Sequence, residues 1–122
     1  MDLTPLSLPL LRRGDIYLVD FGPGLAGEVD KIHPAILVTN NLANQNAHVV
    51  VVVPLTSNLE RVYPFELVME THRTGLNKDS KAQVNLLRHV STSRLLRPLS
   101  FVPDDLMQEL DERLLEHLAL KR

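Results

Sequence analysis

The order of apolar and polar residues along the chain predicts a series of β-strands. Apolar and polar side chains alternate in residues 14–21 and again in 80–87, as in strands with one buried face. Residues 48–55 are β-branched almost throughout, which is typical of a strand buried on both faces. Residues 34–39 and 63–70 complete the series.

Only the C-terminal segment shows a sustained helical period. Leucines recur at steps of four from Leu106 to Leu118, behind Pro103 and two aspartates that suit a helix N-terminus. A shorter helical turn is expected at 91–97, with Ser91 as its cap. Five or six strands followed by one helix predict a mainly β fold, a small antiparallel barrel, closed or half-closed, with a covering helix.

Length and composition fit a single domain. The chain has 122 residues, of which 44% are hydrophobic and 23% charged, and it contains no cysteine. Residues 1–11 are apolar, but Asp2 and two prolines argue against a signal peptide. We therefore expect an N-terminal extension over 1–11, a single domain over 12–122, and no membrane span. The absence of cysteine fits a reducing cytoplasm without fixing the compartment.

Charge is unevenly distributed. The formal net charge is −2, yet segment 61–97 carries seven basic and three acidic residues, whereas segment 103–122 carries six acidic and three basic residues. A basic segment can attract a polyanion, but an excess of this size is more typical of a solvated surface. Charge alone therefore does not identify a nucleic-acid-binding protein.

Several classes of chemistry find no motif here. The sequence contains no phosphate-binding loop of the GxxxxGK[ST] type, no HExxH and no GxSxG, and the five histidines show no metal-ligand spacing. We therefore predict neither a metal site nor a cofactor.

Polar residues gather where two buried strands begin and end. Glu28 and His33 lie in the loop 22–33, and His33 directly precedes the strand that opens with Pro34. Thr56 follows the apolar run 48–55, and Ser57 and Asn58 come next. If these two strands pair as antiparallel neighbours, the start of one lies beside the end of the other, which brings His33 near Thr56.

A carboxylate, an imidazole and hydroxyl groups in one cleft can cleave RNA without a metal. The reaction needs a base for the 2′-proton, an acid for the 5′-oxygen, and a donor toward the charge developing on the phosphorane. Histidine can serve as acid or base near neutral pH. Each group also has an ordinary structural role, as a turn residue, a loop charge or a turn hydroxyl. Residue types alone therefore predict only a small β-barrel, and an anion-binding cleft is one interpretation that they leave open.

The order of short motifs resembles the MazF/PemK-like toxin family. No single match is specific, but together they follow the family's order and nearly its spacing over roughly residues 12–120. The matching stretches are RGDIYLVDFGP (13–23), GE (27–28), HPAILVTNN (33–41), VVPLTSN (52–58), YPFEL (63–67) and GLNKDS (75–80).

The resemblance implies an SH3-like barrel of the CcdB/PemK type. It also implies a cytoplasmic homodimer that is neutralised by a MazE-like antitoxin with a disordered tail. The activity implied is that of an mRNA interferase, an endoribonuclease that cleaves single-stranded RNA without metal and leaves a 2′,3′-cyclic phosphate. Glu28 and Thr56 match catalytic positions of the family, and Phe21 falls where the family often has a substrate contact that could stack on a base.

The chain departs from the family at one important position. His33 stands where the family usually has arginine, and Lys31, in place of a usual glycine, could supply the lost positive charge. A glutamine common in the family is Leu86 here, which leaves Gln83 as a substitute. The predicted catalytic residues are therefore Glu28, His33 and Thr56, and the predicted substrate-binding residues are Phe21, Lys31, Ser57, Asn58, Gln83 and Arg88.

Two alternatives stay open at this level. A catalytically weak or silent member would bind RNA or an antitoxin only. A gyrase poison of the same fold would act by binding protein, but the C-terminal tryptophan expected of that group is missing, since the chain has no tryptophan.

Overall fold

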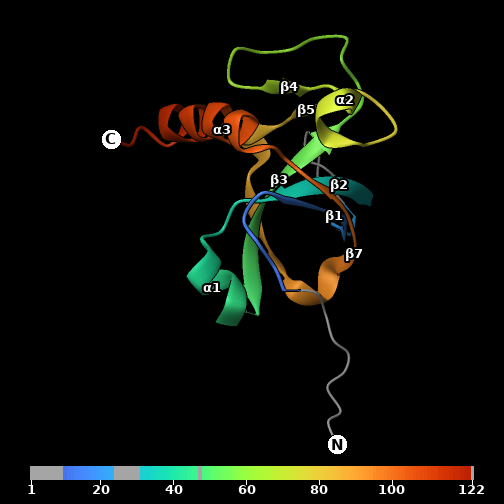
Figure 1. The fold of residues 1–122 in the computed structure, drawn as a ribbon, viewed down its shortest axis with the longest axis vertical. Helices are drawn as coiled ribbons and strands as arrows, with labels where there is room; N and C mark the ends of the chain where they lie inside the picture. Colours follow the sequence, from blue (N-terminus) through green and yellow to red (C-terminus); the bar gives the residue numbers. More distant parts are fainter. Residues whose placement is uncertain (1–9, 24–30, 47, 122) are drawn as a thin grey trace, which may run out of the picture.

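The computed structural model describes residues 10–23, 31–46 and 48–121. Strands dominate this part of the chain, and Figure 1 shows their arrangement. The elements in order are β1 (Asp15–Asp20), β2 (Ile32–Leu37), α1 (Asn41–Asn46), β3 (Val49–Thr56), β4 (Leu67–Met69), α2 (Thr71–Thr74), β5 (Ser80–Ala82), η1 (Val84–Leu86), β6 (Arg88–Ser91), η2 (Thr92–Arg94), β7 (Leu95–Phe101) and α3 (Asp104–His117).

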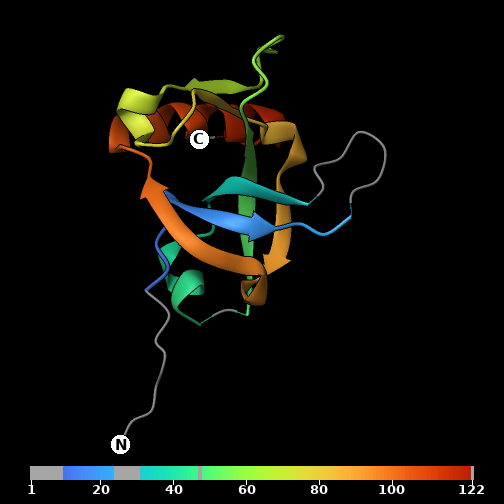
Figure 2. The same ribbon diagram turned by 90° about the vertical axis from the view of Figure 1, so that its right-hand side faces the viewer.

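The seven described strands form one antiparallel sheet in the order β4-β5-β3-β2-β1-β7, and β6 also pairs with β3. β3 is the central strand: Val49–Val52 pair with β6, and Leu55 and Thr56 pair with β5. Figure 2 shows the sheet curling as it passes from β3 through β2 and β1 to β7. No pairing joins β4 to β7 within the described residues, so the predicted antiparallel barrel is open rather than closed.

The central strands of the curled sheet are buried on both faces. In β1, Ile16 joins a core with α3, whereas Tyr17 and Val19 join a second core on the other face. β3 divides in the same way, with Val53 in the first core and Val52 in the second. The prediction that residues 48–55 are buried on both faces is therefore confirmed for most of this strand.

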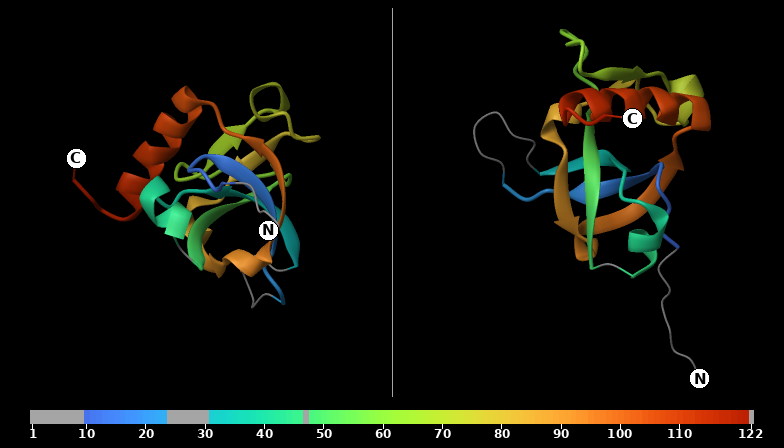
Figure 3. Two further views of the ribbon diagram at one scale, coloured as in Figure 1. Left: turned by 60° about the horizontal axis from the view of Figure 1, so that its bottom comes forward. Right: turned by 90° about the vertical axis from the view of Figure 1, so that its left-hand side faces the viewer.

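The terminal helix covers the first core. Leu106, Met107 and Leu110 of α3 are buried, while Leu118, just beyond the helix, is 48% exposed. Figures 1 and 3 show α3 beside β4 at one end of β3, with α1 at the other end. None of the described helices is long and apolar enough to cross a membrane.

Three sequence predictions about elements were wrong in detail. The strand predicted at 63–70 is only Leu67–Met69, because Tyr63–Glu66 form a turn closed by the Glu66 N–H and the Tyr63 carbonyl (2.9 Å). The alternation predicted for 80–87 fails, because Ser80, Lys81 and Ala82 are all buried and a 3-10 turn follows them. The helical turn predicted at 91–97 ends at Arg94, although its Ser91 cap is confirmed.

The sequence pattern predicts neither the short helix α2 nor the strand β7, which covers residues 95–101. The expected division into an extension over 1–11 and a domain over 12–122 stays a prediction, because residues 1–9 lie outside the described part of the chain.

Candidate functional site

The start of β2 and the end of β3 meet at a cleft of about 530 Å³. His33 borders it from β2, while Thr56 and Ser57 border it from the end of β3 and the residue that follows. The floor is apolar and comes mainly from leucine side chains. The apolar lining residues are Leu18, Pro34, Leu55, Leu76 and Leu99.

The strand register explains why His33 and Thr56 meet. β2 and β3 pair antiparallel, with Ala35 opposite Pro54 and Leu37 opposite Val52. Continuing this register by two residues sets His33 opposite Thr56, with both side chains on the same face. The predicted antiparallel neighbourhood of the two strands is confirmed.

Glu28, the third predicted catalytic residue, lies outside the described residues. The loop that carries it is closed at its base by backbone hydrogen bonds within the described part of the chain. The Phe21 N–H donates to the Lys31 carbonyl (2.7 Å), and the Lys31 N–H donates to the Gly22 carbonyl (2.5 Å). The loop therefore starts and ends beside β1 and β2, next to His33.

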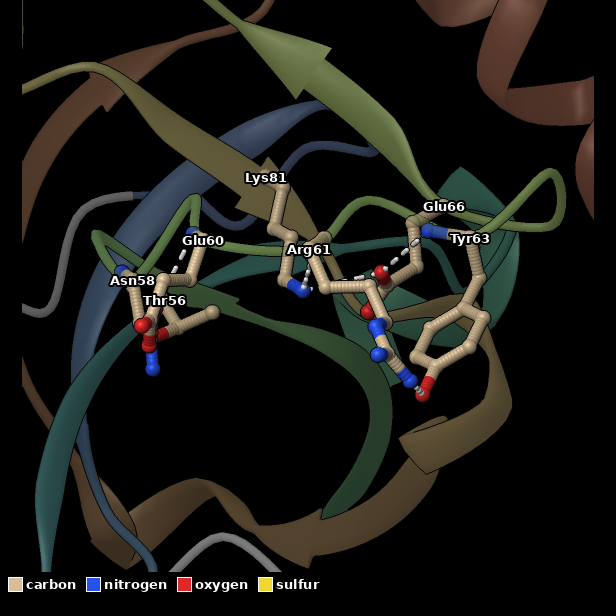
Figure 4. A network of polar contacts seen from close by, with 7 residues as sticks. All are labelled: Thr56, Asn58, Glu60, Arg61, Tyr63, Glu66 and Lys81. Atoms are coloured by element: carbon tan, nitrogen blue, oxygen red, sulfur yellow. Dashed lines mark hydrogen bonds and ion pairs between the residues drawn. The ribbon is translucent and has the colours of Figure 1, made fainter.

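Local hydrogen bonds orient the Thr56 hydroxyl. Its Oγ1 accepts the backbone N–H of Asn58 (3.2 Å), and the Asn58 side chain accepts the N–H of Glu60 (3.1 Å). Figure 4 shows these residues together at the end of β3. The Thr56 hydroxyl donates to no acceptor among the described residues, so its proton is available to donate to an anion.

A buried ion pair supports the loop after Thr56. The Lys81 ammonium lies 2.9 Å from Glu66 Oε1, and their side chains are only 10% and 4% exposed. The ammonium also donates to the Arg61 carbonyl, and Glu66 accepts the Tyr63 N–H (3.0 Å). Figure 4 shows Lys81 reaching from β5 to both groups. The pair fixes residues 61–66, and Lys81 itself pairs with Thr56 in the β3–β5 register.

The other predicted substrate-binding residues do not line the cleft. Phe21 is 4% exposed in the second core, and the Arg88 guanidinium lies 5.4 Å from its ring centroid. The Gln83 Oε1 atom is buried and accepts no hydrogen bond from the described residues. Lys31 and Asn58 are exposed but stand outside the cleft lining. Their contacts with RNA stay predictions.

Four polar lining residues were not predicted from the sequence. Asn77, Lys78 and Ser80 come from the segment after α2, and Arg97 comes from β7. Arg97 lies in the segment 91–97, which was expected to be a helical turn, but it belongs to strand β7. It reaches the cleft because β7 pairs with β1, which is far away in the sequence. For Lys78 and Arg97, the one signal in the sequence was the basic excess of segment 61–97.

The cleft is cationic although the whole chain is acidic. Its described lining contains Lys78, Arg97 and His33 but no aspartate or glutamate. No group of three or more metal-ligating side chains comes together among the described residues. Positive side chains, hydroxyl groups and an apolar floor suit a ligand that carries both phosphates and bases.

Comparison with known proteins gives consistent matches. A family model for the PemK-like, MazF-like toxin of type II toxin–antitoxin systems matches residues 12–118. The chain is 41% identical to endoribonuclease MazF9 of Mycobacterium tuberculosis over 116 residues, which cover 91% of this chain and 98% of that protein.

Solved structures with similar folds include a MazF protein and an endoribonuclease, in agreement with the family match. MazF of Deinococcus radiodurans superposes with a TM-score of 0.79 at 21% identity, covering 92% of this chain and 99% of that one. An endoribonuclease from mycobacterial species, in complex with its cognate antitoxin, gives a TM-score of 0.74 at 22% identity, covering 94% and 99%. At these identities the structural likeness establishes the fold.

Proposed function

The chain belongs to the PemK-like, MazF-like family of toxins of type II toxin–antitoxin systems, and we propose that it is a sequence-specific endoribonuclease that cleaves single-stranded messenger RNA without a metal ion. The observation that carries the proposal is that His33 and Thr56, from the neighbouring strands β2 and β3, line one cationic cleft. The similarity to MazF9, an endoribonuclease, supports the same activity.

In the proposed reaction, the ribose 2′-oxygen attacks the adjacent phosphorus while the bond to the 5′-oxygen breaks. The products are a 2′,3′-cyclic phosphate and a 5′-hydroxyl. Glu28 accepts the 2′-proton, His33 donates a proton to the leaving 5′-oxygen, and the Thr56 hydroxyl donates a hydrogen bond to a non-bridging oxygen. Each proton and electron pair is then accounted for without Lewis-acid chemistry.

The partners follow from the same family. We propose that the chain acts as a cytoplasmic homodimer held inactive by a MazE-like antitoxin with a disordered tail. A solved relative in complex with its cognate antitoxin supports this assignment.

The activity is tested with purified protein and a long single-stranded RNA in EDTA. We expect cleavage, with 2′,3′-cyclic phosphate and 5′-hydroxyl ends. The Thr56→Ala variant should lose roughly a hundredfold or more in kcat, the usual effect of removing one donor to a developing oxyanion.

Thr92→Ala is the matched control, because Thr92 lies in η2, outside the cleft lining. This variant should cleave like the parent chain. An unmodified protein that binds RNA and leaves it intact in EDTA would instead identify a silent family member.

A further inference from the structure

We propose that Arg97, assisted by Lys78, binds the RNA phosphate next to the scissile one. This inference rests on the proposed nuclease function and adds a second phosphate subsite to it. The site would take any single-stranded RNA backbone, so it contributes affinity and placement rather than base recognition.

The sheet places Arg97 in the cleft at a distance from the reacting groups. Arg97 pairs with Leu18 of β1, and Leu18 pairs with Pro34 of β2. Adjacent strands lie about 4.8 Å apart, so Arg97 is two strand spacings from Pro34, about 10 Å, and three from Thr56, roughly 14 Å measured along the sheet. One phosphate held between His33 and Thr56 therefore leaves Arg97 free to meet the next phosphate.

The Arg97 guanidinium has no partner among the described residues. Other arginines do: Arg13 binds Asp111, Arg73 binds Asp105, and Arg94 binds the Asp20 carbonyl. Arg97 is exposed at the cleft with all its donors unused by the described chain. A fork of parallel N–H groups matches two phosphate oxygens better than a point charge does.

Lys78 borders the same cleft from the segment that follows α2. α2 ends at Thr74 and is capped by Gly75, whose φ of 76° is a left-handed conformation that favours glycine. Residues 76–78 follow this turn and form one wall of the cleft. The Ser100 hydroxyl of β7 donates to the Thr74 carbonyl, which ties this wall to the strand that carries Arg97. Both cations thus sit on connected elements and border the same cleft.

The absence of carboxylates from the described lining strengthens the assignment. Asp79 follows Lys78 directly, but it accepts the Thr71 N–H (2.8 Å) and does not line the cleft. A phosphate that binds these cations releases counterions from the RNA, so the contribution of this cleft to RNA affinity should fall as salt rises.

The test measures the affinity of a short, uncleavable 2′-O-methyl RNA as a function of salt, for the parent chain and for Arg97→Ala. We expect Kd to rise roughly tenfold at moderate salt. The slope of log K against log salt should become shallower by about 0.7, the value for one lost phosphate contact on a single strand. Arg97→Lys should retain the slope. Lys78→Ala should shift Kd in the same direction by less.

Arg12→Ala is the matched control, because Arg12 is also an exposed arginine but precedes β1 and lies outside the cleft lining. It should change neither Kd nor slope. Equal thermal unfolding midpoints for the Arg97→Ala and Arg12→Ala proteins would show that both fold.

Measuring kcat and KM for a cleavable RNA distinguishes the phosphate subsite at Arg97 from the proposed nuclease function. Arg97→Ala should raise KM while kcat stays within about threefold, the pattern of lost ground-state binding. A fall in kcat without a change in RNA affinity would overturn the assignment to the neighbouring phosphate. The assignment would also be overturned if Arg97→Ala bound RNA with the same Kd and salt slope as the Arg12→Ala control. A parent chain that binds RNA with the expected slope but never cleaves it would refute the nuclease and leave the phosphate subsite standing.

Discussion

His33 is the second residue of β2, and it borders the cleft beside Pro34. An arginine here would keep its charge at every accessible pH, whereas an imidazole changes charge between about pH 5 and 8. The substitution therefore bears on how the proposed nuclease responds to pH.

We predict that His33→Arg flattens the pH dependence of RNA cleavage. If His33 donates a proton to the leaving oxygen, kcat of the parent chain falls as pH rises through the titration of the imidazole, and a permanently protonated guanidinium removes that fall. The measurement is single-turnover cleavage from pH 5 to 9. A His33→Arg profile parallel to that of the parent chain would rule out a titrating role for His33.

At the scale of residues, the sequence predicts three of the polar residues that line the cleft and misses four. His33, Thr56 and Ser57 were predictable because each lies at or just past the end of a clear apolar run, and the ends of antiparallel neighbours coincide. Arg97 and Lys78 were not, because their position depends on pairing between segments far apart in sequence and on a glycine turn after α2. No local pattern encodes such a contact.

Among the elements, β5 shows that a single ion pair can change the burial that alternation of apolar and polar residues predicts. Alternation predicts that the Lys81 side chain faces away from the core, yet it is buried. Burial is tolerated because the Glu66 carboxylate, 2.9 Å away, neutralises the Lys81 ammonium, and the Arg61 carbonyl accepts a further hydrogen bond from it. The same pair delays the start of the strand predicted at 63–70 to Leu67, since the Glu66 side chain accepts the Tyr63 N–H and closes a turn before the strand. Periodicity carries no information about which lysine will find a buried partner.

We predict that Lys81→Met destabilises the chain by about 3–5 kcal/mol, because it leaves the Glu66 carboxylate buried without a counter-ion. Equilibrium unfolding in urea at pH 7 measures the change. The double variant Lys81→Met/Glu66→Leu should recover much of the loss, since it removes both charges. A single variant within about 0.5 kcal/mol of the parent chain would mean that the pair does not hold the loop after Thr56.

For the whole molecule, the sequence predicted the class and the covering helix but not the shape of the sheet. The leucine period from Leu106 to Leu110 faces the first core as expected. That the sheet stays open could not be predicted, because closure depends on whether the two edge strands, β4 and β7, reach each other. Strand length and pairing of edges are set by tertiary contacts rather than by local propensity.

One ion pair joins α2 to the start of α3 and gives the fold a pH-dependent link. Arg73 contacts both carboxylate oxygens of Asp105 at 2.6 Å. The hydrogen bond from Arg73 holds the pKa of Asp105 below its ordinary value of 3.8. A carboxyl whose pKa is lower in the folded chain stabilises it above the unfolded pKa, and that stabilisation is lost as pH falls through the folded value.

We therefore predict that Asp105→Asn lowers the free energy of unfolding at pH 7. The difference from the parent chain should shrink below about pH 4 and vanish once Asp105 is protonated in the folded chain. Asp104→Asn is the control, because Asp104 shares the first turn of α3 and its dipole but has no bond to Arg73. Urea unfolding from pH 7 to 2.5 measures both variants. If the two show the same pH dependence, the helix dipole rather than Arg73 is responsible, and the link between α2 and α3 contributes nothing of its own to stability.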